Sequence, residues 1–226
     1  SDICEKYQNK YPVVFLSLKG AAGNSFEDAK ARIRAIMSAE AIRHSYLKNS
    51  DKLEESEKKY LLKLMNCILE PMDITDSLAI LTSLLCKHYN RKVILLVDEY
   101  DVPLDKAFLN GYYNDMVGFI RTFLGRALKT NDNTEFAVVT GCLRISKESI
   151  FTGLNNFSTF TITDDLFSQY FGFTDNEVKE MLDYYGVSDY YSTAKDWYDG
   201  YSFGKTEIYC PWDVLNYCSR LRFESD

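Results

Sequence analysis

The sequence feature that most constrains the fold is an apolar run, from Val93 to Val97, that ends directly in acidic residues. The run does not alternate with polar residues, which is typical of a strand buried on both faces of a parallel sheet. The acids that follow are Asp98, Glu99 and Asp101. Ligands of open α/β sheets bind beyond the carboxyl ends of the strands, and a buried carboxylate without a partner is unfavourable. The acids therefore indicate a cation site, and the alternative of equal weight is that they cap the next helix.

Two adjacent acids at a strand end suit the chemistry of a magnesium nucleotide. The first acid, Asp98, can hold Mg²⁺ directly or through water, and the second, Glu99, can orient or deprotonate an attacking water. This is the Walker B arrangement of P-loop ATPases. We therefore predict that Asp98 is the metal ligand and that Glu99 is the catalytic base.

Hydrophobic periodicity on either side of this run predicts an α/β fold with a parallel sheet. We expect helices on both faces of the sheet, joined to the strands by right-handed crossovers. The predicted elements, in chain order, are a strand at 11–18, helices at 25–46, 60–68 and 72–88, the central strand, a loop at 107–113 and a helix at 116–128.

A further buried strand is predicted at 136–140, where it ends in Thr140 before Gly141. In P-loop ATPases of the additional-strand class, the strand beside Walker B ends in a polar residue that senses the γ-phosphate. Thr140 stands at the matching position. A threonine that merely ends a strand before a glycine turn is equally common, so both interpretations are kept.

The composition is that of a globular chain without a membrane helix. Its 33 acidic and 26 basic side chains give a formal net charge of −7, which disfavours non-specific nucleic-acid binding but leaves a local basic patch open. The six cysteines show no C-x-x-C spacing, so no zinc or redox motif is indicated and reduced cytosolic thiols are expected. No apolar run approaches the roughly 18 residues of a membrane helix, and no signal peptide is present. The chain lacks an initiator methionine, so we expect it to be a piece of a longer protein. We expect that protein to be cytoplasmic.

Several stretches together resemble one known family. They are V-D-E-Y-D at 97–101, the segment 141–156, W-Y-D-G-Y-S-F-G at 197–204 and Y-C-P-W at 209–212. In this order they resemble the AAA-ATPase-like family of bacterial proteins, which often carry a PD-(D/E)XK nuclease-like domain at the C-terminus. The resemblance implies a P-loop NTPase-like core at 1–163, a small helical, aromatic-rich lid at 164–226, and the use of ATP and Mg²⁺.

The same resemblance assigns roles to single residues. It matches Asp98 and Glu99 to the Walker B acids and Thr140 to the sensor position. Arg144 lies just beyond the sensor strand, where an arginine can reach the γ-phosphate within one subunit or across the interface of a homo-oligomer. Arg144 can equally pair with Asp101 or Glu148 and hold the loop, so its role stays open.

The phosphate-binding loop of such ATPases is absent from these residues. A P-loop needs G-x-x-x-x-G-K-[ST], whose backbone N–H groups cradle the phosphates while the lysine reaches the β and γ oxygens. The resemblance places this loop and its strand upstream. The one Gly-Lys-Thr, at 204–206, follows Gly200 one position too closely and has no buried strand before it, so we treat it as unrelated to phosphate. A missing central strand would leave an exposed sheet edge that favours dimerisation.

The C-terminal part carries weaker signals. Residues 159–163 alternate and predict a last core strand, and residues 200–204 predict a turn. Thr174 with Glu177 predicts a capped helix, so the nuclease-like spacing of Glu177 and Lys179 is interpreted as a solvent-exposed face. The many aromatic residues favour packing of a small lid over base stacking or partner binding.

The leading hypothesis is ATP hydrolysis that drives a conformational switch in a longer protein. Asp98 would hold Mg²⁺, Glu99 would act as base, and Thr140 with Arg144 would sense the γ-phosphate. The alternative is a degenerate ATPase fold that binds protein or nucleic acid without turnover. The intact pair of Asp98 and Glu99 argues against complete degeneracy.

Overall fold

The computed structural model describes residues 2–68, 73–129, 131–142, 150–151 and 157–225. The chain forms two compact units, residues 1–156 and residues 157–226, and each is described by itself. The assignment of the first part as core and of the second part as lid, with its boundary at 163, stays a prediction.

The first unit is built on a parallel sheet of three strands in the order β1-β2-β3. The strands are β1 (Val13–Ser17), β2 (Val93–Asp98) and β3 (Thr134–Val139). All three strands predicted in this part of the chain are present. The apolar run of β2 occupies the central position, where both of its edges are paired, as its continuous hydrophobicity predicts.

The connections between these strands are helical, as periodicity predicts. Ser25 caps α2 by accepting a hydrogen bond from the Asp28 N–H at 3.2 Å. Residues 107–113 are not the expected loop, because Pro103 lies in the first turn of a helix, where proline is favoured, and that helix continues to Leu109. The helices of this unit are α1 (Asp2–Tyr7), α2 (Phe26–Arg43), α3 (Glu55–Met65), α4 (Ser77–Tyr89), α5 (Val102–Leu109) and α6 (Tyr113–Leu128).

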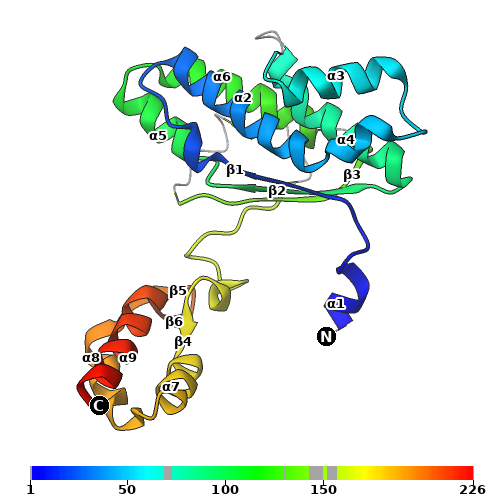
Figure 1. Ribbon diagram of the computed structural model, residues 1–226. Coiled ribbons are helices and arrows are strands. Elements are labelled where there is room, and N and C mark those ends of the chain that lie inside the picture. The colour runs from blue at the N-terminus through cyan, green and yellow to red at the C-terminus, as the bar shows by residue number, and fades with distance from the viewer. Residues whose placement is uncertain (1, 69–72, 130, 143–149, 152–156, 226) are drawn as a thin grey trace. The chain divides into compact units, whose positions relative to one another are not determined.

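The expectation of helices on both faces of the sheet holds unequally in the described residues, because the short helix α1 is the only one of them that meets the second face. Helices α2 to α6 all lie on one side of the sheet in Figure 1. Strands are added in one direction from β1 to β3, and right-handed crossovers in one direction place every connecting helix on the same face. The opposite face carries exposed apolar side chains, with Tyr7 of α1 in ring contact with Phe136 at 6.2 Å. Its exposed residues are Val13, Phe15, Phe136 and Val138.

The two edges of this sheet differ. At the β1 edge, the outward-pointing Phe15 N–H donates to Oε1 of Glu40 at 3.1 Å, so helix α2 closes that edge. At the β3 edge, the alternation of a parallel ladder turns the backbone groups of Glu135, Ala137 and Val139 outward. Within the part of the chain that the structure describes, no further strand pairs with β3.

The second unit packs helices against a small antiparallel sheet in the order β4-β6-β5. Its helices are α7 (Asp175–Tyr184), α8 (Tyr191–Tyr198) and α9 (Pro211–Ser225), and its strands are β4 (Phe173–Thr174), β5 (Asp199–Phe203) and β6 (Thr206–Tyr209). The capping box of Thr174 and Glu177 at the start of α7 is confirmed. The buried core contains Val178, Leu182, Val187, Ala194, Tyr209, Val214, Cys218 and Leu221.

Two predictions for this region are wrong. Residues 159–163 form no strand; instead the Thr161 N–H and hydroxyl both bind Oδ2 of Asp164 at 2.6 and 2.8 Å, which makes a local turn. Residues 200–204 are mostly strand, since β5 and β6 form a hairpin whose turn is Gly204-Lys205. Gly204 has a φ of 53°, a backbone conformation that glycine adopts without strain.

Candidate functional site

Polar side chains converge at the carboxyl edge of the three-stranded sheet. The register pairs Ser17, the last residue of β1, with Asp98, the last residue of β2. Thr140 directly follows β3, and its N–H donates to the Val97 carbonyl at 2.8 Å, which extends the pairing by one residue. The carboxyl ends of parallel strands meet at one edge, so Ser17, Asp98 and Thr140 follow three adjacent strands at the place where α/β sheets bind ligands.

Asp98 and Thr140 are in direct contact. The Thr140 hydroxyl donates a hydrogen bond to Oδ1 of Asp98 at 2.5 Å. A hydrogen bond to an ionised acceptor is shorter and stronger than one between neutral groups, so this contact fixes the orientation of the carboxylate. The second oxygen, Oδ2, makes no hydrogen bond or ion pair with another described residue, so it can face a cation or a water molecule.

Glu99 has an unusual backbone and an unusual side chain. Its φ of 54° lies in the left-handed region, which costs a residue other than glycine roughly 1–2 kcal/mol. Its Oε2 is buried and has no hydrogen-bond partner among the described residues. Buried polar atoms are rarely left without a partner, and backbone strain of this kind concentrates at functional sites. Both observations point to Glu99 as a residue held for a function.

Gly141 allows Tyr100 and Asp101 to pack closely against the backbone that follows Thr140. A Cβ added to Gly141 would lie 2.6 Å from Oδ1 of Asp101 and 2.8 Å from the Tyr100 ring. Both of these neighbours are buried, with exposed fractions of 3% for Asp101 and 8% for Tyr100. The Tyr100 N–H also donates to the Thr140 carbonyl at 3.1 Å, so the chain after β2 and the chain after β3 are held together.

The alternative that the acids cap the next helix finds little support. Asp101 stands at the N-cap position of α5, but its side chain makes no capping hydrogen bond, and only its backbone carbonyl accepts from the Leu104 and Asp105 N–H groups at 2.9 Å. Asp98 and Glu99 precede that cap. Helix capping therefore gives no reason for the two acids that we predicted as metal ligand and base.

The buried carboxylate of Glu40 stabilises β1, the strand that ends in Ser17. Glu40 of α2 is 4% exposed, and its carboxylate contacts the Phe15 N–H, His44 Nε2 at 3.2 Å and Arg43 at 2.8 Å. Burial alone would raise the pKa of Glu40, but the hydrogen bonds from His44 and Phe15 and the charge of Arg43 outweigh it, so the pKa is lowered. Glu40 therefore stays ionised and holds β1 against α2.

The remaining predicted residues lie elsewhere. Arg144 falls outside the described residues. Gly204, Lys205 and Thr206 lie at the hairpin of the second unit, where Lys205 pairs with Asp165 at 2.9 Å, and no helix begins there. Glu177 and Lys179 lie on α7.

Sequence reasoning missed Ser17 and Gly141 as members of the site. Ser17 ends a predicted strand in a hydroxyl, as Thr140 does, so the signal was present. The role of Gly141 depends on the approach of Tyr100 and Asp101, which only the fold reveals.

The donor set at this edge fits magnesium. Mg²⁺ prefers carboxylate and other oxygen ligands, keeps several of its waters, and is commonly bound through one or two carboxylates plus substrate phosphates. Asp98 supplies a carboxylate of this type, and the orphaned oxygen of Glu99 lies next to it in sequence. Across the described residues, no group of three or more His, Cys, Asp or Glu side chains could hold a metal by itself.

Comparison with known proteins settles the family. A family model described as "Predicted AAA-ATPase" matches residues 2–151, which contain the whole sheet and the polar edge. The chain belongs to the AAA-ATPase-like family. The resemblance is therefore confirmed, and the family description supports an ATPase at the level of the family. The match ends before the second unit begins.

A curated relative is similar to part of the AAA-ATPase-like chain. It is described as "Uncharacterized protein in vnfD 5'region" of Azotobacter chroococcum mcd 1 and is 28% identical over 127 residues. The alignment covers 55% of this chain and 24% of the relative, so the chain spans about a quarter of that protein's length. No solved structure matches the chain significantly. No helix among the described residues has the length and apolar character needed to cross a bilayer.

Proposed function

We propose that the polar edge of the first unit is the magnesium and water side of an ATP-hydrolysing site, and that hydrolysis drives a conformational switch in a longer protein. The observation that carries the proposal is the 2.5 Å contact between Thr140 and Asp98, followed in sequence by Glu99, whose buried Oε2 has no partner among the described residues. Asp98 would hold Mg²⁺. Glu99 would orient the attacking water and accept its proton, and ATP with Mg²⁺ would be the cofactors.

Asp98 and Glu99 are adjacent in sequence, and their different contacts support different roles. Thr140 contacts Asp98 and not Glu99, so it would link the metal ligand to the end of β3 and sense the γ-phosphate from there. Arg144 follows on the same segment and would stabilise transition-state charge, within one subunit or across the interface of a homo-oligomer. Ser17 would contribute a second hydroxyl-bearing strand end next to Asp98.

The site requires a phosphate-binding loop, and the sheet offers a place for its strand. The edge of β3 is open in the described residues and adjoins Thr140. A parallel strand added there would end beside Thr140, and a right-handed return from it to β1 would cross the bare face of the sheet. The exposed apolar side chains of that face, Phe15 and Val138 among them, give such a crossover a surface to bury.

A second function uses the same fold without its chemistry. In that case the fold is a degenerate ATPase that binds a protein or nucleic acid without turnover. The strain and the buried oxygen at Glu99 argue against it, because a scaffold has no use for either feature.

The deciding experiment compares two forms of the protein. Mg·ATP binding is measured by calorimetry on this chain and on a form extended upstream through a G-x-x-x-x-G-K-[ST] loop, and ATP turnover is then measured on the extended form. We expect binding by the extended form alone, at least a hundredfold loss of turnover in Glu99→Gln with binding retained, and loss of magnesium-dependent binding in Asp98→Asn.

Glu135→Gln is the matched control, since Glu135 is an exposed carboxylate at the other end of β3. Full turnover in Glu99→Gln would overturn the assigned mechanism. If neither form binds Mg·ATP, the scaffold function takes its place.

A further inference from the structure

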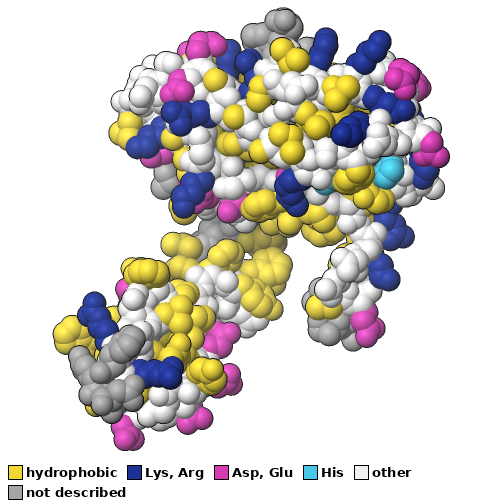
Figure 2. Space-filling view, in the orientation of Figure 1, with side chains coloured by type: hydrophobic (Ala, Val, Ile, Leu, Met, Phe, Trp, Pro, Cys, Tyr) yellow, Lys and Arg dark blue, Asp and Glu magenta, His cyan; other side chains and the backbone are white. Residues whose placement is uncertain are grey.

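The formal charge of the chain is concentrated in the second unit. Residues 157–226 contain 13 acidic and 5 basic side chains, a net charge of 5 − 13 = −8, whereas residues 1–156 contain 20 acidic and 21 basic ones, a net charge of 21 − 20 = +1. A unit of this charge repels phosphate backbones and attracts cationic partners. Figure 2 shows acidic side chains among hydrophobic ones over the visible face of this unit.

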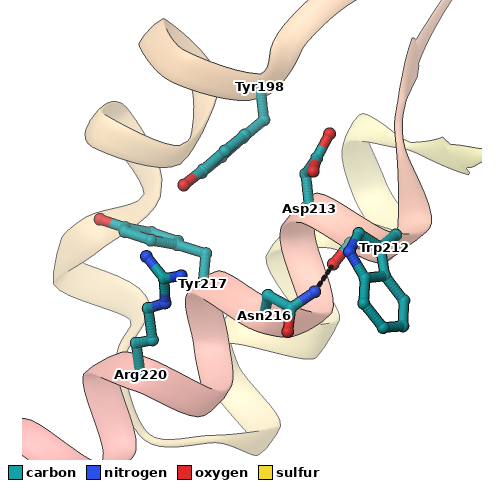
Figure 3. Close-up of a pocket in the computed structure, with 6 residues that line it drawn as sticks. All are labelled: Tyr198, Trp212, Asp213, Asn216, Tyr217 and Arg220. Atoms are coloured by element: carbon teal, nitrogen blue, oxygen red, sulfur yellow. Dashed lines mark hydrogen bonds between the residues drawn. The ribbon is translucent and has the colours of Figure 1, made fainter.

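The same unit has a groove lined by α9 and the end of α8. The groove has a volume of about 340 Å³. Tyr198 contributes from α8, and the α9 residues follow the three- and four-residue spacing of one helix face, as Figure 3 shows. The α9 residues that line it are Trp212, Asp213, Asn216, Tyr217 and Arg220.

The aromatic residues of the groove differ in exposure. Trp212 is 74% exposed, and the core of the unit is formed without it, whereas Tyr198 and Tyr217 are partly buried and pack against that core. Tyr198 and Tyr217 form one wall, with ring centroids 5.3 Å apart and planes tilted by 55°. The Asn216 side chain donates to the Trp212 carbonyl at 2.7 Å, which fixes that amide between the rings.

The groove has opposite charges at its two ends. Asp213 and Arg220 are seven residues apart on α9, which corresponds to about 10 Å along a helix axis. An extended peptide advances about 3.3 Å per residue, so about three of its residues would span this distance. The aliphatic stem of a peptide lysine or arginine can pack against aromatic faces while its charged end binds a carboxylate. The guanidinium of an arginine in the groove can bind carbonyl or carboxylate oxygens of the peptide.

We propose that this groove binds an extended peptide segment of a partner protein that carries a lysine or arginine. The cationic side chain lies among Trp212, Tyr198 and Tyr217 with its charge near Asp213, and an acceptor about three residues away meets Arg220. The net charge of −8 draws basic segments to the unit and disfavours nucleic acid as the occupant. The inference concerns the second unit alone and is independent of nucleotide turnover.

The test uses the whole chain, NMR chemical-shift perturbation and three probes. The first probe is a blocked pentapeptide with arginine at one end and glutamate three residues later, the second replaces its arginine by glutamate, and the third is a single-stranded dT oligonucleotide. We expect the arginine peptide to bind with shifts confined to α8 and α9, and at least tenfold more tightly than either other probe.

Variants locate the binding. Trp212→Ala and Asp213→Asn should each weaken the arginine peptide about tenfold or more. Trp197→Ala and Asp189→Asn should leave it unchanged, because Trp197 is 77% exposed yet lies outside the groove lining, as does Asp189. Circular dichroism shows whether each variant is folded. If Trp212→Ala does not fold, Trp212→Phe is measured in its place. Equal binding by all variants, equal binding of the glutamate peptide, tighter binding of the oligonucleotide, or no binding of the arginine peptide would each overturn the proposal.

Discussion

Thr140 donates its hydroxyl to Oδ1 of Asp98 across 2.5 Å and so joins the ends of two adjacent parallel strands. The bond places a neutral donor on a carboxylate that stands at the ligand-binding edge of the sheet. The same carboxylate is thereby oriented before any cation binds, and preorganisation of this kind avoids reorganisation during a reaction.

Removal of this hydroxyl should affect both stability and the proposed activity. We expect Thr140→Val to lower the free energy of unfolding by about 1 kcal/mol, since it removes one hydrogen bond to a charged acceptor at an exposed position. In the extended form, ATP turnover should fall at least tenfold. Thr134→Val is the control: the Thr134 Oγ1 is buried without a partner among the described residues, so its loss should be neutral or stabilising. Urea denaturation measures both variants, and equal effects would show that the bond is not specific.

The close packing around Gly141 predicts a large effect of one methyl group. Gly141→Ala would place its Cβ against Asp101 and Tyr100, and both are buried and unable to move freely. We expect a loss of about 1–3 kcal/mol, the usual cost of overpacking. Gly125→Ala on α6, where a Cβ meets nothing within 4 Å, should instead stabilise by about 0.5–1 kcal/mol because alanine is the better helix former. In thermal unfolding, we expect a lower midpoint for Gly141→Ala and a higher midpoint for Gly125→Ala than for the parent protein.

The strain at Glu99 predicts a conflict between stability and function. Glu99→Gly should raise the free energy of unfolding by about 1 kcal/mol, because it relieves a positive φ and removes a buried oxygen without a partner. ATP turnover of the extended form should be lost in the same variant. Asn90→Gly, at a φ of 51° that asparagine tolerates, should change stability by less than about 0.5 kcal/mol. A destabilised Glu99→Gly variant would show that the side chain serves the fold.

The second unit should lose stability in acid because of Asp175. The Lys179 ammonium, then the hydroxyls of Tyr191 and Tyr209, lower the pKa of Asp175 from 3.8 to about 2, against a smaller effect of burial. The folded pKa lies below the unfolded one, so this stabilisation is complete above about pH 4 and is lost as the pH falls toward 2. It amounts to about 2 kcal/mol at most at low salt, since each pKa unit is worth about 1.4 kcal/mol.

Asp175→Asn tests this assignment. Its unfolding free energy should be lower than that of the parent at pH 6 and should converge with it near pH 2, as followed by tyrosine fluorescence. Asp196→Asn, on the exposed part of α8, is the charge-matched control and should run parallel to the parent over the whole range. A constant gap between Asp175→Asn and the parent would contradict the titration.

The strands of the first unit and the two acids were predictable because their signals are local. A five-residue apolar run needs two neighbours to bury it, and adjacent acids at its end need a ligand or a cap. The coverage of the sheet was not predictable from periodicity, because an apolar stripe shows that a helix packs against a sheet and does not show which of the two faces it covers. It follows from the order of the strands in the sheet, which depends on pairing between segments that lie far apart in the sequence.

The errors in the second unit have the same origin. Residues 159–163 alternate as a strand would, yet a strand exists only with a partner, and Asp164 instead supplies the hydrogen-bond acceptor for Thr161. Gly200 and Gly204 suggested one turn, but only Gly204 lies in it, while Gly200 falls at an irregularity of β5. The positive φ and orphaned oxygen of Glu99 carry no sequence signal at all, and they proved the strongest marks of the site.

The contact between Glu40 and the Phe15 N–H gives the sheet a direction of growth. One backbone donor of the β1 border is occupied by a side chain that stays ionised at neutral pH, whereas β3 has outward-facing backbone groups that pair with no further strand in the described part of the chain. This difference favours β3 as the border at which a strand is added, whether it comes from the same polypeptide or from another. Two copies that met through β3 would leave only their β1 borders exposed, which disfavours continued growth into a fibril.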